Sequence, residues 1–212
     1  MSSSTSAAQV IVAIGGSRHL SPPGLEVARL ITHALLSSGH TLAVGCATGT
    51  DAAVINAVVA LGLAPQLRIF TAFGPVTGSR LSYAVAGSGS CSSPAAVANA
   101  KHAGARVSAW AGGGPGLDFP TRLSNRTRAV ARAATAGGIL VCDGAPGTGS
   151  SLLVRSLAAR SQPVWLFPVG WVHQFPLPVN GPWSWGWHCL LVNLPCWHLP
   201  AGLGQHSLSL AA

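Results

Sequence analysis

Residues 41–53, TLAVGCATGTDAA, decide the fold that the sequence predicts. Thr41–Val44 is a short apolar run of the strand type, residues 45–51 form a turn of small residues, and a helix follows. We expect Asp51 either to cap this helix by accepting a bond from its first backbone N–H groups or to bond to a ribose or base of a ligand. A glycine turn that opens a helix can bind an anion through free N–H groups, but the same turn also serves where the chain only reverses direction.

The order of strand, small-residue loop and helix recurs along residues 9–170. Strands are expected at 9–14, 41–44, 67–70, 106–110, 139–142 and 164–167, and helices at 24–37, 51–61, 94–102, 124–135 and 152–160. Apolar runs without alternation are typical of parallel strands that are covered on both faces. The sequence therefore predicts an α/β protein, a doubly wound and mainly parallel sheet with helices on both faces.

The two ends of the chain differ from this core in composition. Residues 1–8 are mostly small and polar, without the features of a signal peptide, and we expect a disordered lead. Residues 161–212 contain no Asp, Glu, Lys or Arg and hold six of the seven tryptophans. We expect residues 171–212 to form an irregular extension that packs on the sheet or makes an oligomer contact. Its interrupted apolar stretch is a poor membrane span.

Charge and cysteine usage limit the classes of partner and site. The chain carries a formal net charge of +8 with only four acidic residues. This charge suits nucleic acid or a nucleotide phosphate, although abundant arginine, alanine and glycine also follow from GC-rich coding. Five scattered cysteines are typical of a reduced, cytoplasmic protein. His188, Cys189, Cys196 and His198 have zinc-type side chains, but adjacent His and Cys fit one ion poorly, so we expect no metal and no cofactor.

Three loops of small residues, 15–18, 45–51 and 144–151, each follow a predicted strand. Because ligands of doubly wound sheets bind at the carboxyl ends of the strands, we expect the three loops to line one site. Loop 144–151, GAPGTGSS, has the glycine spacing of a P-loop, but Ser150 stands where the lysine should be and no acid follows Asp143. ATP hydrolysis is therefore not expected, whereas phosphate binding by backbone N–H groups stays open.

The candidate ligand groups at this site are backbone N–H groups and arginines. The N–H groups at positions 16–17, 49–50 and 149–150 are expected to form a cradle, with Arg18 beside it. One of Arg126 or Arg128 is expected to face the site, because residues two apart lie on nearly opposite sides of a helix. The complete set of candidate binding residues is Gly15, Gly16, Ser17, Arg18, Gly45, Ala47, Thr48, Gly49, Thr50, Asp51, Arg126, Arg128, Gly147, Thr148, Gly149 and Ser150.

Four segments of the chain resemble, in order, motifs of the DNA-processing protein A (DprA/Smf) family. They are IVAIGGSR at 11–18, GCATGTD at 45–51, RTRAVA at 126–131 and TGSSL at 148–152. The resemblance covers about residues 9–170 and implies a Rossmann-like core of the SLOG superfamily, which also includes the Lonely-guy enzymes. It implies that the loops hold phosphates of single-stranded DNA. Thr50 and Thr127 depart from the family motifs, which have an aliphatic residue and an asparagine there.

Together these features predict a DprA-like, cytoplasmic protein that binds single-stranded DNA or nucleotide phosphate at the sheet edge, in DNA processing or recombination. We expect a homo-oligomer, no membrane contact and no catalysis. The alternative is a SLOG-type small-nucleotide sensor or a Lonely-guy-like phosphoribohydrolase. Residues 146–149, PGTG, are similar to the Lonely-guy element, but serine and leucine follow where its glutamate should stand.

Overall fold

The computed structural model describes residues 10–75, 83–84, 93–170, 174–187 and 194–202. Its strands are β1 Ile11–Gly16, β2 Thr41–Val44, β3 Leu67–Phe70, β4 Gly74–Pro75, β5 Tyr83–Ala84, β6 Arg106–Ser108, β7 Gly138–Cys142, β8 Val164–Pro168, β9 Ser184–Gly186 and β10 Cys196–Leu199. Its helices are α1 Pro22–Ser37, α2 Thr50–Ala60, the short η1 Ala64–Gln66, α3 Pro94–His102, α4 Phe119–Ala133 and α5 Thr148–Ala158. The predicted lead, residues 1–8, lies outside the described residues.

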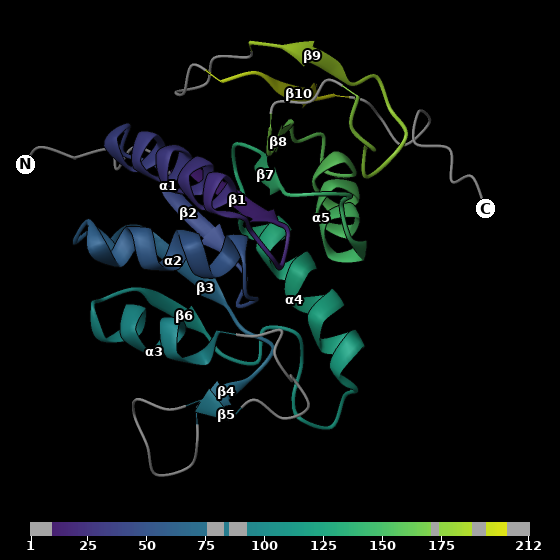
Figure 1. The fold of residues 1–212 in the computed structure, drawn as a ribbon. Helices are drawn as coiled ribbons and strands as arrows, with labels where there is room; N and C mark the ends of the chain where they lie inside the picture. Colours follow the sequence, from purple (N-terminus) through teal and green to yellow (C-terminus); the bar gives the residue numbers. More distant parts are fainter. Residues whose placement is uncertain (1–9, 76–82, 85–92, 171–173, 188–193, 203–212) are drawn as a thin grey trace, which may run out of the picture.

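An eight-stranded sheet in the order β6-β3-β2-β1-β7-β8-β10-β9 forms the centre of the protein (Figure 1). All pairings from β6 to β8 are parallel, and the two pairings beyond β8 are antiparallel. The predicted Rossmann-like, mainly parallel α/β sheet is thus confirmed.

Helices cover both faces of this sheet, as the sequence predicts. On β1, Val12 and Ile14 point into a core that they share with α1, α2 and α3. Ile11 and Ala13 point the other way, into a core with α4 and α5. Because side chains alternate along a strand, this one apolar run supplies both cores, which explains why it shows no alternation of polar and apolar residues.

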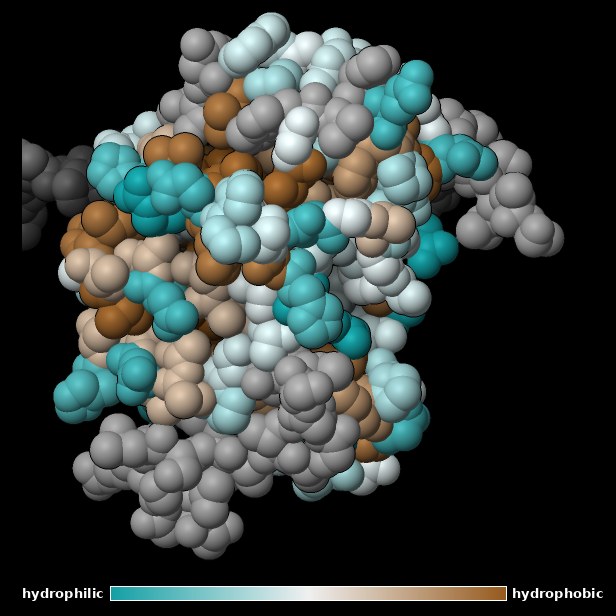
Figure 2. Space-filling view, in the orientation of Figure 1, coloured by the Kyte–Doolittle hydropathy of each residue, from teal (hydrophilic) through white to brown (hydrophobic). Residues whose placement is uncertain are grey.

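The outer surface of α1 and α2 carries scattered apolar side chains. Leu25 and Leu30 on α1 and Leu61, just after α2, are all more than a third exposed. In Figure 2 the brown and tan residues over these helices alternate with teal, hydrophilic ones. Single exposed apolar residues of this kind are ordinary on a protein surface. Within the part of the chain that the structure describes, no helix is long and apolar enough to cross a membrane.

The order of the strands reverses between β1 and β7. From β1 the chain builds β2, β3 and β6 outward on one side, and then returns through α4 to start β7 on the other side. At such a reversal the loops after the two central strands diverge, which leaves a crevice at their carboxyl ends. The candidate site described below lies in this crevice.

The Trp-rich extension forms part of the sheet. β10 pairs with β8 and β9 pairs with β10, so the expected irregular flap was wrong for residues 184–186 and 196–199. The physical reason is that buried Cys196 completes the core on the α1 side and buried Leu199 completes the core on the α5 side. On β10 the His198 ring stacks on Trp165 of β8 with a centroid distance of 5.1 Å, and the Trp197 ring lies tilted against Trp185 of β9 at 5.5 Å.

Candidate anion-binding cleft

A cleft of about 840 Å³ opens at the carboxyl ends of β1 and β7. Its floor comes from the ends of β1 and β2, one wall from α4 and the other from the first turn of α5. The residues that line it are Ile14, Gly15, Gly16, Ser17, Arg18, His19, Gly45, Ala47, Asp51, Phe119, Pro120, Leu123, Ser124, Arg126, Thr127, Val130, Asp143, Ala145, Gly147, Thr148, Gly149, Ser150, Leu152 and Leu153. The three small-residue loops therefore meet at one site, as expected.

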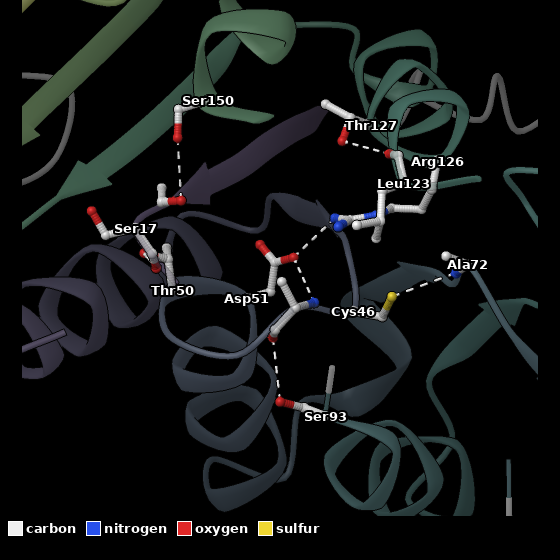
Figure 3. Close-up of polar contacts among 12 residues, drawn as sticks. Ser17, Cys46, Thr50, Asp51, Ala72, Ser93, Leu123, Arg126, Thr127 and Ser150 are labelled. Atoms are coloured by element: carbon white, nitrogen blue, oxygen red, sulfur yellow. Dashed lines mark hydrogen bonds and ion pairs between the residues drawn. The ribbon is translucent and has the colours of Figure 1, made fainter. Parts of the chain in front are cut away.

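Hydroxyl groups tie the three loops together (Figure 3). Thr50 Oγ1, at the start of α2, donates to the carbonyl oxygens of Ser17 at 3.2 Å and Val141 at 3.1 Å. Ser150 Oγ, at the start of α5, donates to the Gly16 carbonyl at 3.2 Å. A Cβ at Gly16 would lie 1.9 Å from the Val141 oxygen, so only glycine allows this approach. These bonds hold the three loops against one another at the floor of the cleft.

Asp143 holds the loop after β1 against the end of β7. Its backbone N–H donates to Ser17 Oγ at 2.9 Å, and Ser17 Oγ donates to the Asp143 carbonyl at 3.1 Å. Its carboxylate accepts from the Ser21 N–H at 2.6 Å. Hydrogen bonds from Ser21 lower the pKa of the Asp143 carboxyl. A carboxyl with a lowered pKa stays ionised at neutral pH, so Asp143 suits a structural role better than that of a proton donor.

Asp51 forms a buried ion pair with Arg126 on the floor of the cleft (Figure 3). Arg126 Nη1 lies 3.0 Å from Asp51 Oδ2, which also accepts from the Ala47 N–H at 3.0 Å. The side chains of Arg126 and Asp51 are only 10% and 8% exposed. Burial raises the pKa of the Asp51 carboxyl, and the charge of Arg126 opposes that rise. A Cβ at Gly45 would lie 1.5 Å from Arg126 Nη1, so this glycine makes room for the pair.

The expected helix cap by Asp51 was wrong. The N-cap residue of α2 is Gly49, with φ +69°, and no side chain caps the helix. Asp51 lies inside the first turn, and its carboxylate bonds back to Ala47 and across to Arg126 instead. An ion pair with an arginine 75 positions later along the chain could not be inferred from the local sequence.

The expected cradle of N–H groups was wrong for Ser17 and Thr50, one group at each of two of its three positions. The Ser17 N–H donates to the Val141 carbonyl at 3.0 Å, and the Thr50 N–H donates to the Ser17 carbonyl at 2.9 Å. Both groups are therefore used within the fold and are not offered to a ligand. The third position differs, because the N-cap of α5 is Gly147, which has no side chain to cap the helix. The first turn of α5 lines the cleft.

Arginines on different sides of α4 differ in burial, as the helical spacing predicts. Arg122 and Arg126 are buried, whereas Arg128 is exposed and donates to Asn125 Oδ1 at 3.0 Å. Arg122 is not among the residues that line the cleft. It donates to the Ala72 carbonyl at 3.2 Å and lies 5.6 Å from the ring of Trp110. Arg126 thus faces the cleft, and Arg128 does not.

Exposed Arg18 lines the cleft beside the loop after β1. Because the charge of Arg126 is matched by Asp51, Arg18 brings the cleft an exposed positive charge that a ligand can reach. An exposed arginine beside a helix N-terminus is a favourable arrangement for binding an anion.

The structure brings most of the predicted residues to the cleft. The exceptions are Thr48, Gly49, Thr50 and Arg128, which do not line it. The sequence reasoning missed the first turn of α4, because we expected that helix to begin at 124. Asp118 caps α4 through a bond of 2.9 Å from the Thr121 N–H, and Pro120 follows in the first turn. Both are helix-start signals that could have revealed Phe119 and Leu123 as part of the wall.

Part of the cleft lining is apolar. Phe119, Leu123 and Val130 of α4 and Leu152 and Leu153 of α5 contribute to it. An apolar wall beside a helix N-terminus and a cation suits a ligand with a flat organic part and a phosphate, such as a nucleotide.

None of the three cysteines that the structure describes, Cys46, Cys142 and Cys196, lines the cleft. Burial raises the pKa of the Cys142 thiol to about 12 and also raises that of Cys46. Of the four zinc-type candidates, His188 and Cys189 lie outside the described residues, Cys196 is buried in a core and His198 stacks on Trp165. Within the described ranges no group of three or more His, Cys, Asp or Glu side chains could hold a metal ion.

Comparison with known proteins supports the fold. No family model and no curated protein matches the sequence. One similar structure is DNA processing protein A (DprA) from Streptococcus pneumoniae, with a TM-score of 0.52 and 16% identity over 74% of this chain and 49% of that one. Another is DNA processing protein A from Helicobacter pylori, whose single-stranded DNA binding mode has been described. Its TM-score is 0.52, with 14% identity over 74% of this chain and 64% of that one.

The predicted DprA-like fold is thereby confirmed. This chain spans about half the length of the first of these proteins and less than two thirds of the second.

Proposed function

We propose that this protein binds single-stranded DNA through its phosphates in the cleft at the carboxyl ends of β1 and β7. The observation that carries the proposal is the first turn of α5, which begins at a glycine without a capping side chain and opens into the cleft beside Arg18. The first N–H groups of a helix have no partner within the helix, and the helix dipole favours an anion there.

Each part of the cleft has a role under this proposal. The N–H groups at the start of α5 bind a phosphate, and Arg18 supplies the charge. The pair of Asp51 and Arg126 has no net charge, so the carboxylate on the floor does not repel the ligand. Asp143 is turned toward Ser21 by its hydrogen bond. The apolar wall of α4 and α5 remains for the base or sugar.

Two further observations support DNA as the ligand. The formal net charge of +8 favours a polyanion, and the similar Helicobacter pylori protein binds single-stranded DNA. Under this proposal the protein acts in DNA processing or recombination, in the cytoplasm and as a homo-oligomer, as the sequence predicts.

A small nucleotide is the second candidate ligand, as in a SLOG-type sensor. The observation in its favour is the size of the cleft, about 840 Å³, which falls within the roughly 300–1,000 Å³ of small-molecule sites. Phosphoribohydrolysis is less well supported. The carboxylates that line the cleft, Asp51 and Asp143, are both hydrogen-bonded within the fold.

The test is a binding titration over a range of salt concentrations with oligo-dT, duplex DNA and a mononucleotide. We expect oligo-dT to bind best and its affinity to fall steeply with salt, because each phosphate contact contributes about −0.7 to the logarithmic slope for a single strand. Arg18→Ala should weaken binding about tenfold, the scale of one hydrogen bond to a charged group.

Arg160→Ala is the matched control, because it removes the same charge from an exposed position beyond the far end of α5. It should leave the affinity nearly unchanged. If oligo-dT does not bind, or if Arg18→Ala binds as well as the control, the proposal is wrong. Tight mononucleotide binding with little salt dependence would favour the sensor instead.

A further inference from the structure

We propose that His19 is a second ligand-binding side chain of the cleft, and that its protonated imidazole binds a phosphate together with Arg18. This inference rests on the proposed function and adds to it a dependence of binding on pH. His19 is exposed and lines the cleft, as does Arg18 directly before it. Both residues lie in the loop between the end of β1 and the start of α1.

Asp143 anchors this loop before and after the segment 18–20. Its backbone N–H donates to Ser17 Oγ at 2.9 Å, and its carboxylate accepts from the Ser21 N–H at 2.6 Å. A side chain on an anchored backbone loses less conformational freedom when it binds a ligand, which favours binding. The backbone that carries His19 is therefore held in place before a ligand binds.

The middle of the loop is packed as well. Leu20 packs against the core that α1 shares with the sheet. The backbone of Arg18 lies close to the start of α2, because a Cβ at Gly49, the N-cap residue of that helix, would lie 2.4 Å from the Arg18 carbonyl carbon. Arg18 and His19 are the exposed side chains of the segment 18–20.

His19 differs from the other charged or titratable side chains that line the cleft within the described residues, which are Arg18, Asp51, Arg126 and Asp143. Histidine is the side chain whose charge ordinarily changes between about pH 5 and pH 8. A protonated imidazole has a positive charge and two N–H donors, whereas the neutral ring has one donor and one acceptor. Since hydrogen bonds from a charged donor to phosphate are stronger, the affinity of the cleft for phosphate should rise as the pH falls through this range.

Asp51 is a second group whose protonation would change the charge of the cleft. Burial raises the pKa of its carboxyl, and a protonated Asp51 would leave the charge of Arg126 unmatched. Hydrogen bonds from Ser21 lower the pKa of the Asp143 carboxyl, so Asp143 stays ionised. The test therefore changes His19 and leaves Asp51 as it is.

The test measures the affinity for oligo-dT at about pH 8 and about pH 5.5 with the salt concentration held constant. The phosphodiester groups of this ligand keep the same charge at both values. We expect the wild type to bind about tenfold more tightly at the lower pH, the scale of one hydrogen bond to a charged group. His19→Gln cannot become charged, so it should lose this gain. His19→Lys is charged at both values, so it should bind at about pH 8 nearly as tightly as the wild type does at the lower pH.

His102→Gln is the matched control, because His102 is exposed at the last residue of α3 and does not line the cleft. It should keep the wild-type gain in affinity. If the wild type shows no gain, if His19→Gln keeps it in full, or if His19→Lys binds no better than His19→Gln at about pH 8, the role of His19 is overturned while the cleft function stands. If the wild type does not bind oligo-dT at either pH, the proposed function itself fails.

Discussion

Two glycine loops of this protein look alike in sequence and differ in what their glycines do. Loops 45–51 and 144–151 each follow a central strand and open a helix at the same edge of the sheet. In the first loop the glycines are enclosed. A Cβ at Gly45 would collide with Arg126, and a Cβ at Gly49 would lie 2.2 Å from the Ser17 carbonyl oxygen. These glycines are needed for close packing within the fold.

The second loop is open. A Cβ at Gly144, Gly147 or Gly149 would meet no atom within 4 Å. Packing therefore does not require glycine at these positions, although Gly144 has a positive φ of +77° that favours it. A glycine pattern of the phosphate-binding type thus identifies the edge of the sheet where a ligand can bind, but not which helix start is left free to bind it.

The largest effect is expected from Asp51→Asn in the closed loop. The change leaves Arg126 buried without a counter-charge, and breaking a buried pair in this way costs about 3–5 kcal/mol of unfolding free energy. Chemical denaturation would measure the loss. Glu26→Gln is the matched control, because it makes the same change in an ion pair whose side chains are more than half exposed. If the two variants lose similar stability, the floor of the cleft does not depend on the buried pair.

Gly49→Ala should have the next largest effect. The φ of +69° alone costs a residue with a Cβ about 1–3 kcal/mol, and the approach to the Ser17 oxygen adds to that cost. Gly62→Ala is the control that measures the cost of the positive φ alone, since Gly62 has the same φ of +69° but no atom within 4 Å of its Cβ position. Thermal denaturation of the two variants should therefore show a clearly larger fall in Tm for Gly49. Equal losses would mean that the closed loop is not tightly packed.

The smallest effect, with the opposite sign, is expected for Gly149→Ala in the open loop. Gly149 lies in the first turn of α5 and has space for a Cβ, so alanine should raise the unfolding free energy by up to about 0.5–1 kcal/mol. The Tm of the variant provides the measurement. A fall in Tm would show that loop 144–151 is packed around its glycines as closely as loop 45–51.

Local patterns in the sequence were sufficient to predict the core of the fold. The apolar runs of β1, β2 and β7 are continuous because the sheet is covered on both faces, and glycine or proline ends most of the helices that follow. The antiparallel strands β9 and β10 could not be predicted in the same way. They are short, and β10 is ordered by its pairing with β8, some thirty residues earlier along the chain.

The sequence was sufficient to predict where the candidate site lies, but not which groups contact one another there. The rule that ligands bind at a reversal of strand order locates all three loops. It cannot show that the Thr50 N–H is taken by Ser17, or that Asp51 is held by Arg126. Each of these contacts joins segments that only the folded sheet brings together. Whether a given N–H group is left for a ligand therefore depends on the tertiary structure.

The placement of β10 beside β8 has a consequence for self-association. Without β10, a chain ending at residue 170 would present the N–H and C=O groups along one side of β8 as an unpaired edge, with Leu166 and Phe167 next to it. Such an edge is a template on which other copies can add strands and aggregate. With β10 and β9 in place, the sheet ends instead in a strand of only three residues. We therefore expect β9 and β10 to protect the sheet from edge-to-edge aggregation.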